Sequence, residues 1–161
     1  MNAFVVDTNV AVVANGRETH ASDRCQYSCI EKLENIVDGG LIVIDDANFI
    51  MTEYERRLHF QGAPGVGDMF YRHVFDNQYI TAKVQRVLIH STADGSFQEF
   101  PNDPSLNGFD PDDHMFVAVA LESSRNPKIL NAVDNDWKQF QTKLMNHGLV
   151  VVQLCPEELR G

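Results

Sequence analysis

Four acidic residues lie in four separate segments, and each stands where an α/β fold would bring carboxylates together. They are Asp7, Glu53, Asp113 and Asp134, and Asp136 follows the last of them by two residues. Close carboxylates repel one another unless a cation lies among them, so their convergence would create a divalent-metal site. Ligand sets made only of oxygen favour hard cations, and the sequence therefore predicts Mg²⁺ or Mn²⁺ rather than zinc.

Placement separates these acids from the others among the 23 in the chain. Glu53 shares one side of an expected helix with Ile50 and Tyr54, and Asp113 stands at the head of an apolar helical stripe that includes Phe116. An unpaired carboxylate on a buried face loses its hydration and usually takes up a proton or a cation. A shared metal explains this placement more simply than separate partners would.

Ordinary structural roles remain open for each acid. Asp7 could end a strand or cap the next turn, and Asp113 lies in a first helical turn, where any acid is favoured. Glu53 could pair with a neighbouring arginine at the surface. Asp134 and Asp136 could cap the last helix.

Apolar runs and helical spacings predict an α/β fold with alternating strands and helices in one domain, residues 1–161. Strands are expected at 3–6, 41–44, 84–89, 128–133 and 149–154, and helices at 22–37, 45–58, 68–76, 110–123 and 136–146. The predicted architecture is a three-layer α/β/α sandwich with a mainly parallel, about five-stranded central sheet. Sites in such sheets form at the carboxyl ends of strands, where Asp7 and Asp134 lie.

Four other acids are interpreted as helix caps, namely Asp45, Asp46, Asp110 and Asp112. The long polar stretch from 90 to 110 predicts a loop, and a loop of that length is more often functional or mobile than accidental.

Net charge of −10 and a pI near 4.9 argue against a protein that holds duplex nucleic acid through its overall field, but leave a nucleic-acid enzyme open. The first residues lack a basic region, and no run approaches the about 20 apolar residues of a membrane span. A soluble, cytoplasmic protein that does not bind membranes is expected.

The odd number of cysteines argues against a secreted disulfide framework. Cys25 and Cys29 lie four apart in an expected helix with His20 upstream, so a metal or redox pair is conceivable. Buried, inert thiols are the favoured interpretation because free cysteine packs as a small apolar residue.

Four segments in order resemble those of the PIN-domain nucleases. They are VVDTNV at 5–10, MTEYERRL at 51–58, DDHMFVAVAL at 112–121 and NAVDNDW at 131–137. The resemblance implies a PIN-like fold and a metal-dependent endoribonuclease, with RNA as substrate. It also implies that the protein could be the toxin of a toxin–antitoxin pair, restrained by a small protein partner; a homodimer is left open.

Carried over by position, the resemblance implies that Asp7, Glu53, Asp113 and Asp134 are the catalytic and metal-binding acids, with Asp136 as a less regular ligand. A supporting role in holding the first aspartate is implied for the residue at position 9, an asparagine (Asn9).

One position departs from the family. Members often carry Thr or Ser two residues before the fourth acid, and Ala132 stands there. If the missing hydroxyl contacts metal or phosphate, Asn131 or Asp136 would have to compensate.

The predicted reaction is hydrolysis of a phosphodiester by metal-activated water, which Glu53 could orient. Weaker candidates for contacting phosphate are Arg17, Arg56, Arg57, Lys83 and Arg86. Tyr54 and Trp137 could stack on an unpaired base, although packing in the core is the favoured role for both.

Two rival functions stay open. One is a Mg²⁺-dependent phosphatase with a strand-end aspartate nucleophile, but Asp7-Thr8-Asn9 lacks the second acid of an Asp-x-Asp motif. The other is a catalytically weak or inactive module that binds a protein or nucleic acid, which the acidic surface and Ala132 would fit.

Overall fold

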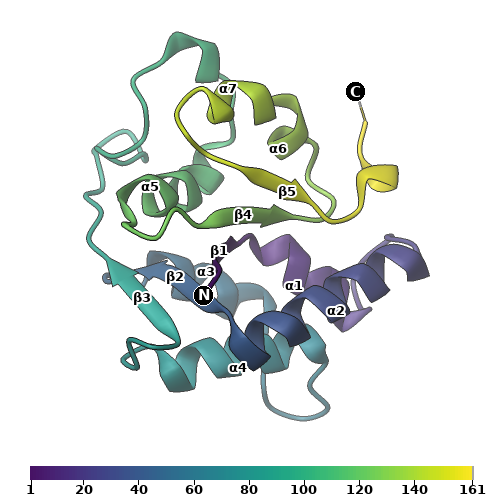
Figure 1. Cartoon of the computed structure of the whole chain (residues 1–161). Coiled ribbons are helices and arrows are strands. Elements are labelled where there is room, and N and C mark those ends of the chain that lie inside the picture. Colours follow the sequence, from purple (N-terminus) through teal and green to yellow (C-terminus); the bar gives the residue numbers. More distant parts are fainter. Residues whose placement is uncertain (161) are drawn as a thin grey trace.

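The structure is a computed structural model in which residues 1–160 are described. Five parallel strands form one sheet in the order β3-β2-β1-β4-β5 (Figure 1). Their bounds are β1 Ala3–Val6, β2 Leu41–Asp45, β3 Val84–Val87, β4 Lys128–Asn131 and β5 Val151–Gln153. The predicted α/β class with a parallel, five-stranded sheet is confirmed.

The centre of the sheet is a topological switch point. From β1 the chain runs to β2 on one side, and it later returns to pair β4 with β1 on the other side. Val6 pairs with Leu130, and the amide of Asp7 extends this pairing with a 3.2 Å bond to the carbonyl of Leu130. A crevice at the carboxyl ends of two diverging strands is where open α/β sheets bind ligands.

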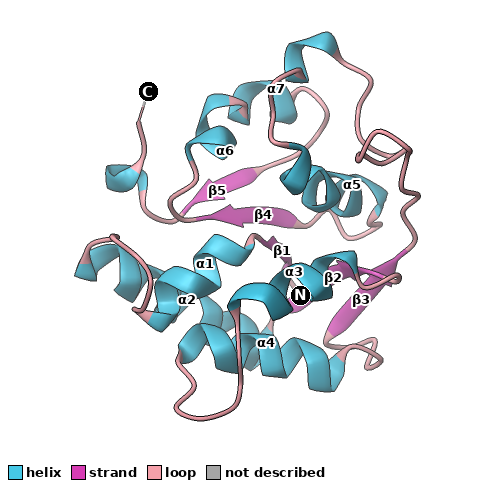
Figure 2. Ribbon diagram, turned by 180° about the vertical axis from the view of Figure 1, so that it is seen from behind, coloured by secondary structure: helices cyan, strands magenta, loops and turns pink. Residues whose placement is uncertain are grey.

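Helices flank the sheet in two groups, and both views agree on them. The group formed by α1, α2 and α4 lies below β4 and β1 in Figures 1 and 2, and α5, α6 and α7 lie above. The bounds are α1 Thr8–Asn15, α2 Asp23–Gly39, α3 Phe49–Arg57, α4 Val66–Asn77, α5 His114–Glu122, α6 Asn135–Gln139 and α7 Gln141–Met145. Three short 3₁₀ turns are η1 Pro104–Leu106, η2 Pro111–Asp113 and η3 Pro156–Glu158.

Helix α1 was not among the helices expected from the sequence. It begins directly after Asp7, whose carboxylate accepts the backbone N–H of Asn9, and it ends at Gly16 with a φ of 71°. Only glycine adopts that backbone conformation without steric cost. Nearly every residue of α1 is buried, so its pattern lacks the polar face that marks a helix in a sequence.

The helix predicted at 136–146 is divided in two at Phe140. The backbone of Phe140 leaves the helical region with a φ of −99° and a ψ of 6°. Its ring packs edge-on against Phe109 with 5.5 Å between ring centres. The break therefore lies where the ring of Phe140 packs against the long loop, a contact that local spacing does not reveal.

The stretch from 90 to 110 is a loop, as predicted, and aromatic contacts fix it to the body of the protein. Phe97 packs edge-on against Phe49 of α3, and Phe100 stacks on His114 with ring centres 3.7 Å apart. Phe109 is buried in the main core. The loop thereby covers the end of the molecule at which α5 begins.

The cysteines differ from the expectation of three inert thiols. Cys25 and Cys155 form a disulfide across 130 residues of sequence, and Cys29 is a free, buried thiol. That expectation is therefore wrong for two of the three. Sequence spacing gave no sign of the pairing because Cys155 approaches α2 only through the path of the chain after β5.

Among the described residues, no helix combines the length and apolar character that crossing a membrane requires.

Candidate metal centre

Three of the predicted acids converge on one point. Asp7, Asp113 and Asp134 each offer a carboxylate oxygen, and these oxygens all lie within 4.8 Å of one another. The residues come from three places in the fold: the end of β1, the 3₁₀ turn before α5, and the turn after β4. Because β1 and β4 are neighbouring parallel strands, their carboxyl ends bring Asp7 and Asp134 to the same edge.

Both carboxylate oxygens of Asp7 accept hydrogen bonds. The backbone N–H and the side-chain amide of Asn9 donate to Oδ1 at 2.9 and 2.8 Å. The indole Nε1–H of Trp137 donates to Oδ2 at 2.7 Å. These donors hold the carboxylate in one orientation, as the supporting groups around metal ligands do.

Asn9 also joins β1 to the turn after β4. Its Nδ2 donates to Oδ1 of Asn131 at 3.0 Å, and its Oδ1 accepts from the backbone amides of Ala132 and Val133. Asn131 in turn donates to the backbone carbonyl of Asp134 at 2.9 Å. The supporting role predicted for Asn9 agrees with this network, and Asn131 holds the turn that carries Asp134.

The network bears on the missing hydroxyl at position 132. The side chain of Ala132 is fully buried, and its backbone amide is fixed by Asn9. Asn131 accepts the amide of Asp134 at 3.2 Å as well as binding its carbonyl. The turn is therefore held from both sides of Ala132 without a hydroxyl.

The carboxylate of Asp113 is buried in surroundings that do not satisfy its hydrogen bonding or its charge. Its side chain is only 9% exposed, and Oδ2 is buried without a hydrogen-bond partner. Burial raises the pKa of Asp113 far above its usual range, and the negative charges of Asp7 and Asp134 raise it further. A divalent cation would supply the missing partner and offset all three charges, so the donor set fits a hard cation.

Burial and a neighbouring charge also raise the pKa of Asp7, but by less than that of Asp113. Burial raises its pKa to about 6, and the donors Asn9 and Trp137 oppose that rise, whereas the charge of Asp134 adds to it. The three groups therefore cannot all be ionised near neutral pH at low cost unless a cation joins them.

Glu53 lies outside the three-acid group, as defined within residues 1–160. It is on α3, where its carboxylate pairs with Arg56 at 3.2 Å, and its side chain is 28% exposed. This is the surface pairing that the sequence left open. Its expected roles as metal ligand and as orienting base gain no support from this position and stay predictions.

Asp136 also lies outside that group of described acids and serves a different contact. Its Oδ2 accepts the backbone amide of Asp110 at 3.2 Å, and its own amide donates to Oδ1 of Asp134 at 3.0 Å. Asp136 therefore links the turn before α5 to the start of α6. This contact sets the approach of Asp113 to Asp134.

Asp45 shows that an aspartate at a strand end is not necessarily a metal ligand. It ends β2 as Asp7 ends β1, and it is almost fully buried. Its oxygens accept three backbone amides, from Ala47, Phe49 and Ile50, each at 2.9 Å. Its expected role as a helix cap is confirmed, because these bonds satisfy it at the start of α3.

The basic residues expected to contact phosphate are mostly engaged elsewhere. Arg17 pairs with Asp68 at 2.5 Å and Arg56 with Glu53, whereas Arg86 donates to the carbonyl of Asp46. These contacts favour structural roles for the three arginines.

Two other basic residues remain exposed. Lys83 lies before β3, and Arg57 ends α3. Arg57 lines a hollow of about 360 Å³ together with Asn9 and Val133, two members of the network beside the acids. Among the five candidates, Arg57 therefore has the position best suited to a phosphate near the centre.

The aromatic residues considered for base stacking are core residues. Tyr54 is fully buried and donates to the carbonyl of Val6 at 2.6 Å, and Trp137 is fully buried against Asp7. Stacking by either is therefore wrong, and packing, the favoured role, is confirmed. Sequence reasoning missed that Trp137 orients an acid; a tryptophan one turn after a strand-end aspartate was the only signal.

Comparisons of the chain with models of protein families, with curated proteins and with solved structures found no match.

Proposed function

We propose that this protein is a metal-dependent nuclease that hydrolyses phosphodiester bonds in RNA. The observation that carries the proposal is the convergence of Asp7, Asp113 and Asp134 at the switch point of the sheet, with a buried oxygen of Asp113 left without a partner. Burying several like charges together costs free energy unless a cation binds among them, so such a group indicates a functional site.

The three aspartates would hold Mg²⁺ or Mn²⁺. When bound, such an ion lowers the pKa of a coordinated water and offsets negative charge that develops on a phosphoryl group. Around it, Asn9 and Trp137 keep the Asp7 carboxylate oriented, and Asn131 keeps the turn of Asp134 in place. Asp136, through the amide of Asp110, holds the turn that carries Asp113.

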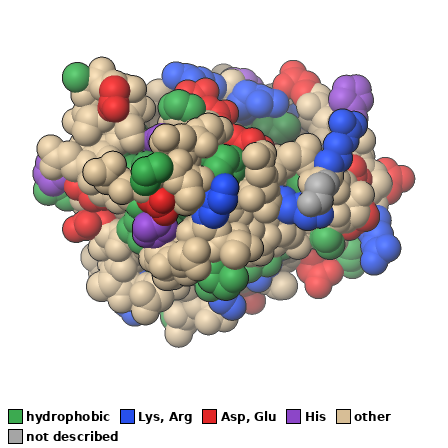
Figure 3. All heavy atoms as spheres, turned by 90° about the horizontal axis from the view of Figure 1, so that it is seen from above, with side chains coloured by type: hydrophobic (Ala, Val, Ile, Leu, Met, Phe, Trp, Pro, Cys, Tyr) green, Lys and Arg blue, Asp and Glu red, His purple; other side chains and the backbone are tan. Residues whose placement is uncertain are grey.

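Substrate contact requires positive charge beside these acids. Arg57 is proposed to contact a backbone phosphate, because it lines the same hollow as Asn9 and Val133. On the face seen in Figure 3, Lys and Arg side chains lie between acidic ones, so the net charge of −10 does not cover that face with one sign. RNA can approach such a surface locally despite the overall charge.

RNA is chosen over DNA because of the resemblance of the four sequence segments to PIN-domain nucleases. The same resemblance supports a role as the toxin of a toxin–antitoxin pair with a small protein partner. Glu53 and Asp136 are proposed as secondary groups that act through water, since each already holds a protein partner.

The test is cleavage of a mixed RNA pool by the purified protein with Mn²⁺ and with EDTA. We expect cleavage that depends on the metal, and Asp7→Asn should reduce its rate by about 100-fold or more. Asp112→Asn is the matched control, because it removes the same charge from an exposed position next to the centre. Absence of cleavage by the wild type, or equal cleavage by Asp7→Asn, contradicts the proposal.

Calorimetry with Mn²⁺ separates the enzyme from a binding module that shares the fold. The proposed enzyme must bind the ion through the three aspartates, and Asp7→Asn must weaken that binding. A protein that binds RNA equally well with and without Mn²⁺, and does not cleave it, would be such a module.

A further inference from the structure

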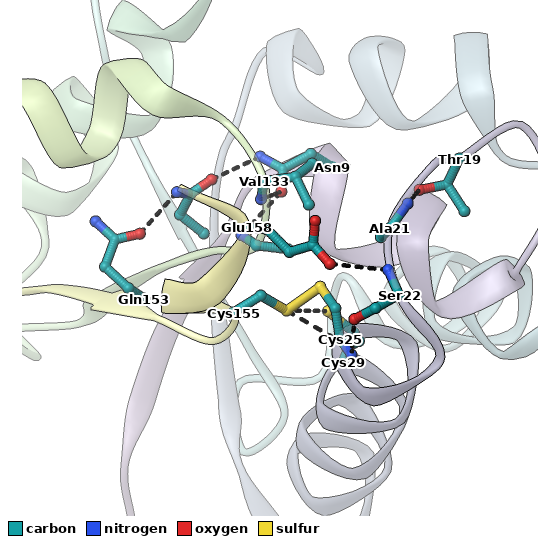
Figure 4. Close-up of a disulfide and its surroundings, with 12 residues drawn as sticks. Asn9, Thr19, Ala21, Ser22, Cys25, Cys29, Val133, Gln153, Cys155 and Glu158 are labelled. Carbon is teal, nitrogen blue, oxygen red and sulfur yellow. Dashed lines mark hydrogen bonds between the residues drawn. A yellow bond between two sulfur atoms is a disulfide. The ribbon is translucent and has the colours of Figure 1, made fainter. Parts of the chain in front are cut away.

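All three cysteines of the chain meet in one buried cluster, which joins two neighbouring cysteines to one that is remote in sequence. Cys25 and Cys29 lie on α2, and Cys155 follows β5. Each is fully buried, and the three sulfur atoms lie within 4.8 Å of one another. Figure 4 shows both α2 cysteines beside Cys155.

The disulfide accounts for only two of these sulfurs. Cys25 and Cys155 are bonded, while the thiol of Cys29 lies 4.0 Å from Sγ of Cys155. Residues four apart on a helix share one face, so both α2 cysteines point toward the same partner. Sγ of Cys155 is therefore one corner of a compact triangle of sulfurs, bonded to one α2 sulfur and in contact with the other. Attack in line with the Cys25–Cys155 bond requires the Cys29 side chain to rotate first.

We propose that the three cysteines form an intramolecular thiol–disulfide exchange centre, in which Cys155 pairs with either Cys25 or Cys29. The thiolate of Cys29 attacks Sγ of Cys155, a Cys29–Cys155 bond forms, and the Cys25–Cys155 bond breaks. Cys25 leaves as a thiolate and takes up the proton that Cys29 has lost. One disulfide and one thiol are present before and after, so the step needs no oxidant or reductant.

The surroundings of the sulfurs slow the exchange and confine it to these three cysteines. Burial raises the pKa of the Cys29 thiol to about 12, and the carboxylate of Glu157 adds to the rise, so little thiolate is present near neutral pH. Full burial also keeps dissolved thiols away from all three sulfurs. The structure holds the bond to Cys25, and Cys29 is the alternative partner of Cys155.

The exchange centre keeps the carboxyl-terminal segment attached to α2 in either state. That segment also contacts α2 through Glu158, which accepts the backbone amide of Ser22 at 2.8 Å (Figure 4). Two residues before Cys155, Gln153 accepts a 2.7 Å bond from Asn131. If one α2 cysteine is lost, Cys155 can therefore still bond to the other. A disulfide without a third cysteine nearby would be lost. The inference is independent of the nuclease proposal.

The first test compares Cys25→Ala with its matched control Cys29→Ala, two changes of the same kind one helical turn apart. Each full-length variant is reduced, reoxidised with oxidised glutathione, alkylated under denaturing conditions and mapped by mass spectrometry. Both should lose their two free thiols, with a Cys29–Cys155 bond in the first and a Cys25–Cys155 bond in the second. Two free thiols in Cys25→Ala, under conditions that fully oxidise Cys29→Ala, overturn the proposal.

The second test uses the wild type, so that it does not depend on the folding of a variant. Oxidised protein is held at pH 9 without added thiol, quenched with acid, denatured and labelled at its free thiol. The proposal predicts that Cys25 gains label as Cys29 loses it, with the total label unchanged. Label that stays on Cys29 alone, in protein whose disulfide is intact, overturns the exchange.

Discussion

The three-acid group and the cysteine cluster are assembled in a similar way, but the first gathers charged groups and the second gathers uncharged ones. Each brings three short side chains from remote segments within 4.8 Å, and each depends on a segment at the end of a sheet strand. The cysteine sulfurs carry no charge, and two of the three are joined by a disulfide while Cys29 stays a thiol. The carboxylates repel, and one of their buried oxygens has no partner. Convergence alone therefore does not identify a ligand site, whereas convergence with unsatisfied charge favours one.

The largest expected effect is on the cysteine side. Cys155→Ala should lower the free energy of unfolding of the oxidised protein by about 2–5 kcal/mol, because the disulfide closes a long loop in the unfolded chain. Urea denaturation with and without a reducing agent measures this. The reducing agent should destabilise the wild type by a similar amount and leave Cys155→Ala unchanged. If the reducing agent breaks the wild-type disulfide without lowering the free energy of unfolding, the disulfide does not stabilise the fold.

On the acid side, Asp113→Asn should weaken Mn²⁺ binding about 100-fold, or about 3 kcal/mol, because it removes one of three charged ligands. Titration calorimetry gives the affinity directly. Asp112→Asn, which keeps the cluster intact, should bind like the wild type. Equal affinities for the two variants would place the ion elsewhere.

The two clusters should also respond differently to pH. Folding raises the pKa of Asp7 to about 6 and that of Asp113 as well, so the folded protein without metal holds protons more tightly than the unfolded chain. The contribution of Asp7 is fully present below about pH 4 and is lost as the pH rises through 6, a change on the order of 1–3 kcal/mol. The contribution of Asp113 goes on being lost as the pH rises toward about 10.

Urea denaturation between pH 4 and 8 in EDTA measures this loss, and saturating Mn²⁺ should reverse it at pH 8. Asp113→Asn should reduce the pH dependence, since the raised pKa of Asp113 no longer contributes. A metal-free protein whose cluster adds stability as the pH rises would contradict the raised pKa values.

A smaller effect is expected from Trp137→Phe, which keeps a ring in the core and removes one hydrogen bond. The bond from Nε1 to Asp7 is buried, and its loss should cost about 1–2 kcal/mol of unfolding free energy. It should also raise the pKa of Asp7 further, because a donor to the charged form is lost. Denaturation gives the first quantity. The second follows from the pH dependence of Mn²⁺ binding, which should shift upward.

The smallest effect distinguishes Glu53 from the three aspartates. Glu53→Gln breaks a partly exposed pair with Arg56, so the unfolding free energy should change by less than about 0.5 kcal/mol. Mn²⁺ affinity measured by calorimetry should fall far less than in Asp113→Asn. A loss as large as in that variant would show that Glu53 is a full ligand and that α3 moves when metal binds.

Much of the fold followed from local patterns. Short apolar runs such as 41–44 predicted buried strands, because a parallel sheet covered on both faces has no polar alternation. Helix α2 followed from apolar residues at helical spacing, and in the structure the hydroxyl of Ser22 accepts the amide of Cys25 at its start. Where local signals were ambiguous or absent, prediction failed: α1 has no polar face, and the division at Phe140 depends on a ring from a distant loop.

Local sequence was enough to place the strands and to identify Asp45 and Asp110 as caps, because both signals depend on neighbours a few residues away. Only the tertiary structure decided which acids share a centre: it brought Asp113 to Asp7 and Asp134, and left Glu53 with Arg56. It also decided that Cys155 meets α2. The physical reason is that repulsion between carboxylates and bonding between sulfurs act over a few ångströms, and those distances are set by how remote segments pack.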